Sequence, residues 1–256
     1  SDVTALVQRT KNVIYIEEGE FAEISSNSIK VYNNTGEPVI RDKTRIIWDV
    51  EAAEKGGYEH FMLKEIMEQP RAIKSAIEPR IKKGYISFED SNIPDNLLEK
   101  VNRIYITACG SAYHAACTGK YMIEELARIP VEVDLASEFR YRRPIIDSST
   151  LVIVISQSGE TADTIAALKE AKENGAPVLA IVNVVGSAIS KLADYVIYTW
   201  AGPEIAVATT KGYTTQVTVL CLLSVYFAQK NKKISEETAL KLTNEIQKIP
   251  QLAQRA

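Results

Sequence analysis

The stretch that most constrains the fold is residues 151–161, LVIVISQSGET. Its first five residues are apolar and mostly β-branched, and such a run ending in a turn signal predicts a strand buried on both faces. The next six residues, SQSGET, carry three hydroxyls, a glutamine and a glycine, and a helical pattern follows them. Free backbone N–H groups and the helix dipole favour an anion at that point. We therefore predict a phosphate-binding loop of hydroxyls and backbone amides, with an ordinary helix cap as the alternative.

The same alternation of strand and helix continues through the second half of the chain. The expected strands are 103–108, 131–135, 151–155, 178–182 and 195–199, and the expected helices are 112–128, 138–142, 162–174, 210–229 and 236–254, with 186–192 linking the last two strands. Helix 210–229 is apolar almost all round from Val217 to Phe227, so it should be buried. Five strands alternating with helices predict an α/β fold with a doubly wound parallel sheet.

The commonest strand order for a five-stranded sheet of this type is 2-1-3-4-5, the flavodoxin-like order. The first and third strands are then neighbours, and ligands bind where both end. Here those ends carry Cys109-Gly110-Ser111 and the SQSGET loop, so two distant segments should converge on one crevice. The absence of GxGxxG and GxxxxGK[ST] motifs argues against dinucleotide and nucleoside triphosphate binding.

Residues 1–57 have a different pattern, with short strands expected at 12–17, 21–25, 29–32, 39–40 and 45–48. Turn residues separate them, which is typical of an antiparallel meander. Because so short a segment buries little surface, it should either pack on the rest of the chain or be the end of a larger domain, and we favour the second interpretation. Residues 58–76 predict a connecting helix, kinked or ended at Pro70. Residues 87–95 are polar and resemble a loop, and a short helix is expected at 96–100.

Composition excludes several classes of function. The 30 basic and 33 acidic residues are interspersed, which leaves no basic face for nucleic acid. No apolar run approaches the roughly 18 residues of a membrane span, and the first residues lack a signal peptide pattern. Three cysteines without metal-type spacing and only two histidines argue against a metal site, and we expect no cofactor. We expect the three cysteines to be reduced thiols, which indicates a cytoplasmic protein.

At this point several motifs carry a family resemblance. The segments ITACGSAYHA, ISQSGETADT and AGPEIAVATTKGYTTQ resemble the sugar isomerase (SIS) fold. With ASEFRYRRPIID, AIVNVVGSAIS and AAEKGGYEHFMLKEIMEQPRAI, the chain more closely resembles the first SIS domain of the isomerising glutamine–fructose-6-phosphate aminotransferases, the glucosamine-6-phosphate synthases. The resemblance implies that 1–57 end a glutaminase domain, that 58–95 form a linker helix and connection, and that 96–256 form a SIS sugar-phosphate-binding domain.

The resemblance also implies site residues. The SQSGET loop would hold the phosphate of fructose 6-phosphate through Ser156, Gln157, Ser158 and Thr161. The family's CGTS turn here reads CGSA, so Ala112 lacks a hydroxyl that Ser111 could partly replace. The family's VAST segment, which lines the sugar, corresponds to Val207, Ala208, Thr209 and Thr210.

The groups that open the sugar ring belong, in the family, to the second SIS domain, so we expect no catalytic residue in this chain. Glu160 is expected to be structural, because a carboxylate would repel phosphate. For Glu204, orienting a sugar hydroxyl and capping a helix are equally open. Lys211 could balance the charge of the ligand, but a solvated lysine is the commoner outcome and is expected here.

Two main functions follow. The chain is either part of the enzyme that converts fructose 6-phosphate and glutamine to glucosamine 6-phosphate and glutamate, inactive alone, or a non-catalytic sugar-phosphate sensor. A stand-alone SIS isomerase is a third possibility. The resemblance also implies a homodimer formed through SIS domains.

Overall fold

The computed structural model describes residues 9–17, 19–45, 55–94 and 96–256. The chain divides into two compact units, Ser1–Gly57 and Tyr58–Ala256, and each is described by itself. The proposed origin of the first unit in a glutaminase domain stays a prediction.

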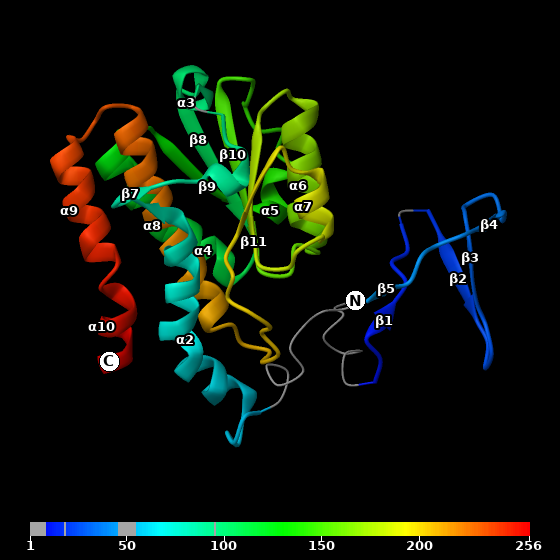
Figure 1. Ribbon diagram of the computed structural model, residues 1–256. Helices are drawn as coiled ribbons and strands as arrows, with labels where there is room; N and C mark the ends of the chain where they lie inside the picture. The colour runs from blue at the N-terminus through cyan, green and yellow to red at the C-terminus, as the bar shows by residue number, and fades with distance from the viewer. Residues whose placement is uncertain (1–8, 18, 46–54, 95) are drawn as a thin grey trace. The chain divides into compact units, whose positions relative to one another are not determined.

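The first unit is built from short antiparallel strands, as expected (Figure 1). Strands β2 (Phe21–Ile24), β3 (Ile29–Tyr32) and β4 (Pro38–Val39) form a three-stranded sheet. Strands β1 (Asn12–Val13) and β5 (Thr44–Arg45) form a separate pair. Beyond Arg45, the strand expected at 45–48 lies outside the described residues. Only two of the unit's described hydrophobic side chains, Val13 and Val31, are buried, which agrees with the small core expected from its length.

The second unit contains the predicted parallel sheet. Its strands are β8 (Arg103–Ala108), β9 (Val131–Leu135), β10 (Thr150–Ser156), β11 (Val178–Val182) and β12 (Tyr195–Tyr198). The sheet order is β12-β11-β10-β8-β9, and every neighbouring pair is parallel. This order is 2-1-3-4-5, so the predicted fold class and switch point are confirmed.

Helices cover both faces of this sheet (Figure 1). Successive side chains of a strand point to opposite faces, and in β10 the odd residues Leu151, Ile153 and Ile155 pack in the core with α4 (Ser111–Ala127) and α8 (Lys211–Lys230). The even residues Val152 and Val154 pack with α5 (Ala136–Phe139), α6 (Ala162–Glu173) and α7 (Ala188–Leu192). Every residue of β10 is buried, as its unbroken apolar run predicts.

The connecting helix, α2 (Phe61–Ile77), continues through Pro70, so the alternative that the helix ends there is wrong. A proline removes the N–H that would bond the carbonyl four residues earlier. That carbonyl belongs to Ile66, and the side-chain amide of Gln69 donates to it at 3.1 Å. The lost backbone hydrogen bond is therefore replaced locally, and α2 packs along α8 without ending.

The segment between α2 and the sheet is more ordered than expected. Strands β6 (Ile81–Lys82) and β7 (Tyr85–Ile86) form a hairpin, followed by the 3-10 helix η3 (Glu89–Ser91) and the short helix α3 (Leu97–Lys100). A further 3-10 turn, η2 (Glu78–Arg80), follows α2 directly.

The last predicted helix, 236–254, is two helices, α9 (Glu236–Ile246) and α10 (Ile249–Arg255). The break precedes Pro250, whose ring and missing N–H favour the first turn of a new helix. The predicted cap of α9 is confirmed, since Ser235 accepts a hydrogen bond from the Thr238 N–H at 3.2 Å.

Candidate functional site

The ends of β8 and β10 place two loops side by side. Ile155, near the end of β10, is in register with Ala108, the last residue of β8. The chain after β8 turns at Gly110, which has φ of +58°, into the first turn of α4. The chain after β10 forms the SQSGET loop, with Thr161 as the residue that precedes α6. The start of two helices therefore faces the same edge of the sheet.

A pocket of about 160 Å³ lies between these loops. It is lined by Cys109, Ser111, Ala112, Ile155, Ser156, Gln157, Ser158, Thr161, Thr209 and Gln216. Six of the seven predicted binding residues are thus brought together, and the seventh, Val207, is fully exposed and does not line the pocket. Among the described lining residues there is no Lys or Arg, so hydroxyls, amides and backbone N–H groups supply the polar lining.

Internal hydrogen bonds fix the shape of the SQSGET loop. The hydroxyl of Ser156 accepts from the N–H of Gly159 at 3.0 Å and lies 3.0 Å from the hydroxyl of Thr161. The hydroxyl of Ser158 accepts from the N–H of Glu160 at 3.2 Å. Because these serine oxygens act as acceptors within the loop, hydroxyl hydrogens remain to be donated to a ligand.

Gly159 is required by this geometry. Its φ is +68°, a region that side chains disfavour, and a Cβ there would lie 2.6 Å from the Cβ of Ser187 and still closer to its hydroxyl. The Gly159 carbonyl also accepts from the N–H of Ile189 at 3.0 Å. The loop is therefore packed directly against the start of α7.

Glu160 has a structural role, in agreement with the prediction. Its Oε1 accepts a hydrogen bond from the N–H of Ala188 at 2.8 Å, at the start of α7. A carboxylate at this position satisfies a free helix N–H and is stabilised by the dipole.

Glu204 caps the helix that carries the other side of the pocket. Its Oε1 accepts from the N–H groups of Thr210 and Gly212 at 2.8 and 3.1 Å, and its Oε2 accepts from the hydroxyl of Thr209 at 2.8 Å. Of the two roles left open by the sequence, the structure therefore supports capping of α8.

Lys211 is a correction to the sequence prediction. Its side chain is 2% exposed, and Nζ lies 2.7 Å from Oε2 of Glu68 on α2. A buried lysine needs such a partner, because desolvation of an unpaired charge is costly. The partner is 143 residues away in sequence and could not be recognised from local pattern.

Four pocket residues, Cys109, Ala112, Ile155 and Gln216, are not among the predicted binding residues. Gln216 is 97% buried in the first half of α8, and its place at the end of the polar KGYTTQ segment, just before the apolar stretch, gives no sequence signal of a pocket residue. Cys109 lines the pocket from the end of β8, where Thr164 contacts its sulfur at 3.9 Å.

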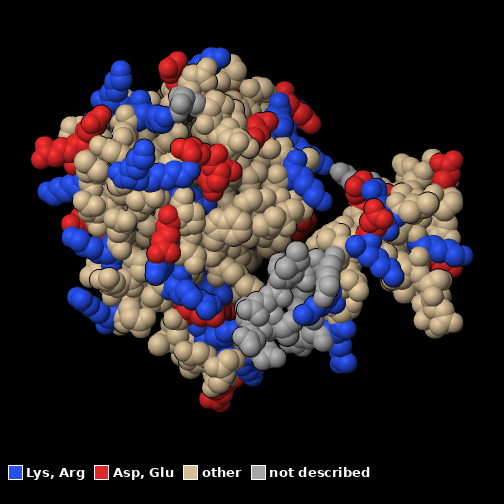
Figure 2. Space-filling model, viewed as in Figure 1, with Lys and Arg blue, Asp and Glu red and all other residues tan. Residues whose placement is uncertain are grey.

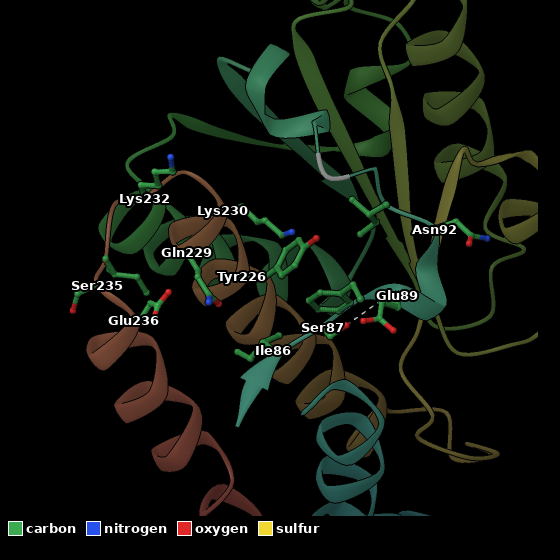
Figure 3. A pocket seen from close by; sticks show the side chains of 13 residues that line it. Ile86, Ser87, Glu89, Asn92, Tyr226, Gln229, Lys230, Lys232, Ser235 and Glu236 are labelled. Carbon is green, nitrogen blue, oxygen red and sulfur yellow. Dashed lines mark hydrogen bonds between the residues drawn. The ribbon is translucent and has the colours of Figure 1, made fainter. Parts of the chain in front are cut away.

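A larger cavity, of about 990 Å³, lies at the C-terminal end of α8 (Figure 3). Tyr226, Gln229 and Lys230 line it from α8, and Ser87 and Glu89 line it from the segment after β7. It mixes acidic, basic and aromatic groups, and none of the predicted site residues lies in it. The small pocket at the switch point is therefore the better candidate for a phosphate, on its chemistry.

The surface and the remaining side chains add little specific chemistry. On the face in Figure 2, blue and red side chains are interspersed over the described residues. In the described part of the chain, no cluster of three or more His, Cys, Asp or Glu could hold a metal ion. No helix among the described residues is both long and apolar enough to cross a membrane.

Comparison with known proteins identifies close relatives over the whole chain. Glutamine–fructose-6-phosphate aminotransferase [isomerizing] of Clostridium acetobutylicum is 52% identical over 99% of this chain, and the protein of the same name from Caldanaerobacter subterraneus subsp. tengcongensis is 53% identical over 99%. The chain spans 42% of the length of each of these relatives. The resemblance expected from the motifs is confirmed.

A solved structure agrees with this result. The C-terminal domain of glucosamine-fructose-6-phosphate aminotransferase from Francisella tularensis aligns with a TM-score of 0.75 and 39% identity, over 78% of this chain and 56% of that one. The family model for the SIS domain matches residues 97–226, just over half of the chain, and this range contains both pocket loops. The chain therefore belongs to the SIS domain family.

Proposed function

We propose that the pocket at the ends of β8 and β10 binds the phosphate of fructose 6-phosphate or glucosamine 6-phosphate. In this proposal the chain is part of an enzyme that converts fructose 6-phosphate and glutamine to glucosamine 6-phosphate and glutamate. The observation that carries the proposal is the convergence of Ser111, Ser156, Gln157, Ser158 and Thr161 on one pocket where two helices begin. A phosphate there accepts hydrogen bonds from hydroxyls and backbone N–H groups and is stabilised by the helix dipoles.

The hydrogen bonds within the loop assign roles to its hydroxyls. The Ser158 oxygen accepts from a backbone N–H, so its hydrogen can be donated to a phosphate oxygen. In the pair Ser156–Thr161 one hydroxyl donates to the other, and the second hydrogen is available to the ligand. In this proposal Thr209, on the other side of the pocket, lines the sugar. Its hydroxyl donates to Glu204, so its oxygen can accept from a sugar hydroxyl. Exposed Val207 would contact the sugar only if the ligand extends beyond the pocket.

The name of the relatives supports this choice of substrate, since they are aminotransferases for fructose 6-phosphate. Their similarity extends over 99% of this chain and so includes the segment before the SIS match, which a sensor or a stand-alone isomerase would not need. We infer that the sugar-ring and amide-transfer chemistry belongs to parts of the enzyme other than this pocket. On this basis the chain alone makes no glucosamine 6-phosphate, and it functions in the cytoplasm as a homodimer.

The test is thermal unfolding of the 256-residue chain with and without fructose 6-phosphate. Ligand at 100 times its Kd adds about 2.7 kcal/mol to the stability of the folded state, which raises the Tm by roughly 5–10 °C for a unit of about 200 residues. Fructose, which has no phosphate, should give no shift. Ser156→Ala should reduce the shift, whereas Thr118→Ala, a hydroxyl removed from the exposed face of α4, should preserve it. No shift with millimolar fructose 6-phosphate would reject the site.

A further inference from the structure

Residues 201–210, in the segment between β12 and α8, bring Thr209 to the pocket but contain no helix or strand. Backbone N–H groups outside regular structure need other partners, so the side chains that bind this loop determine its position. Among the described residues, three side chains do so, and they bind its beginning, its middle and its end.

Asn183 binds the beginning of the loop. Its Oδ1 accepts from the N–H of Ala201 at 2.9 Å, and its Nδ2 donates to the carbonyl of Gly202 at 2.8 Å. Its own N–H donates to the carbonyl of Gln157 at 3.1 Å, which joins the loop to the SQSGET segment. Glu204 binds the end of the loop through its capping bonds to Thr209, Thr210 and Gly212.

The middle of the loop is bound by a residue from a distant part of the sequence. Glu65 on α2 is 98% buried, and its Oε1 accepts from the consecutive N–H groups of Ile205 and Ala206 at 2.6 and 3.0 Å. Hydrogen bonds to a charged acceptor are among the stronger ones in proteins. Glu65 lies 140 residues before Ile205 and outside the range that matches the SIS family.

A second contact holds α2 at this point. Glu68, one turn further along α2, pairs with buried Lys211 at 2.7 Å, and Lys211 is the first residue of α8. Lys64 lies 3.8 Å from the other oxygen of Glu68. The helix that carries Glu65 is thus fixed to the start of α8. The loop of residues 201–210 is bound to Glu65 at its middle and joined to α8 at its end, so it cannot shift without moving α2 or α8.

We infer that Glu65 is a positioning residue for the sugar side of the pocket: α2 holds the loop that presents Thr209, although α2 precedes the SIS domain. This inference rests on the proposed function, because it concerns the same ligand. It predicts that the two sides of the pocket can be separated. The phosphate contacts come from the β8 and β10 loops, whereas the sugar contacts depend on Glu65.

The experiment compares Glu65→Ala, Glu65→Gln and the unchanged chain by calorimetric titration with fructose 6-phosphate and with inorganic phosphate. Glu65→Ala removes both hydrogen bonds to the loop and should weaken fructose 6-phosphate binding about tenfold, the change that 1.4 kcal/mol produces. Binding of inorganic phosphate should stay unchanged. Glu65→Gln keeps a carbonyl oxygen that can accept from both N–H groups and should restore affinity to within about threefold. Glu78→Ala, which removes a 65%-exposed carboxylate just after α2, is the matched control and should bind both ligands normally.

The outcomes separate this inference from the proposed function. If the unchanged chain binds no fructose 6-phosphate, the proposed function fails. If it binds and Glu65→Ala binds equally well, or loses both ligands to the same degree, the positioning role is wrong. If Glu65→Ala does not fold, hydrogen exchange in the unchanged chain tests whether Glu65 holds the loop. The amides of Ile205 and Ala206 should then exchange as slowly as those within α8, and rapid exchange of both overturns the inference.

Discussion

Substitution of Gly159 by alanine tests the packing of the SQSGET loop against α7. The backbone of Gly159 has φ of +68°, and forcing an alanine into the left-handed region costs about 1–2 kcal/mol. The new Cβ would also lie 2.6 Å from the Cβ of Ser187. Overpacking of this kind typically costs a further 1–3 kcal/mol, so we expect Gly159→Ala to lose about 2–5 kcal/mol of unfolding free energy.

Two further variants separate these contributions. Gly175 has φ of +75°, and no atom lies within 4 Å of the position that a Cβ would take there, so Gly175→Ala should lose only the backbone cost of about 1–2 kcal/mol. Adding Ser187→Gly to Gly159→Ala removes the side chain in the way and should recover the steric part. Glycine at a helix N-cap costs only a few tenths of a kcal/mol, so the second change adds little of its own.

The assay is urea unfolding followed by far-UV circular dichroism, which reports on the helices of the second unit. Fructose 6-phosphate affinity is measured in parallel and should fall for Gly159→Ala but not for Gly175→Ala. If Gly159→Ala is no more destabilising than Gly175→Ala, the loop does not pack on α7 as described, and the derived shape of the pocket is wrong.

Three other predictions follow from named contacts. Lys211→Met leaves its carboxylate partner on α2 without its closest cation and should lower the free energy of unfolding by about 3 kcal/mol. Lys248→Met, at an exposed ion pair, should lower it by less than about 1 kcal/mol. Equal losses for the two variants in urea unfolding would contradict the buried pair. Cys109 lines the pocket, so fructose 6-phosphate should slow its alkylation, whereas Cys117 should react at an unchanged rate. Peptide mass mapping measures both rates. Alkylation of Cys109 at an unchanged rate would argue against the site. Burial raises the pKa of the Cys221 thiol, so at pH 8 less of it is thiolate than in an ordinary cysteine. Its alkylation should therefore become fast only at higher pH. Rapid alkylation at pH 8 would show that this sulfur is accessible.

The sheet could be predicted from sequence because its signal is local. β8, β9 and β11 have the expected bounds. β8 and β11 are apolar runs buried in the sheet, whereas β9, at its edge, alternates apolar and acidic residues, and both patterns are local strand signals. The strand order then brought two loops to one edge, and the residues of those loops line one pocket.

Two contacts that the sequence did not predict depend on distant partners, whereas the effects of the prolines are mainly local. Pro70 does not end α2, because Gln69 replaces the missing hydrogen bond and packing on α8 supports the helix. Lys211 is buried only because Glu68 lies opposite, and Glu65 contacts the loop only because α2 packs there. Such pairings join residues about 140 positions apart, which neither periodicity nor motif spacing can relate.

The most direct test of the account is a crystal structure of this chain with fructose 6-phosphate. We predict the phosphate within hydrogen-bond distance of the Ser156, Ser158 and Thr161 hydroxyls, at the ends of β8 and β10, with the sugar directed toward Thr209. A phosphate in the larger cavity at the C-terminal end of α8, or no bound ligand at a concentration that raises the Tm, would contradict it.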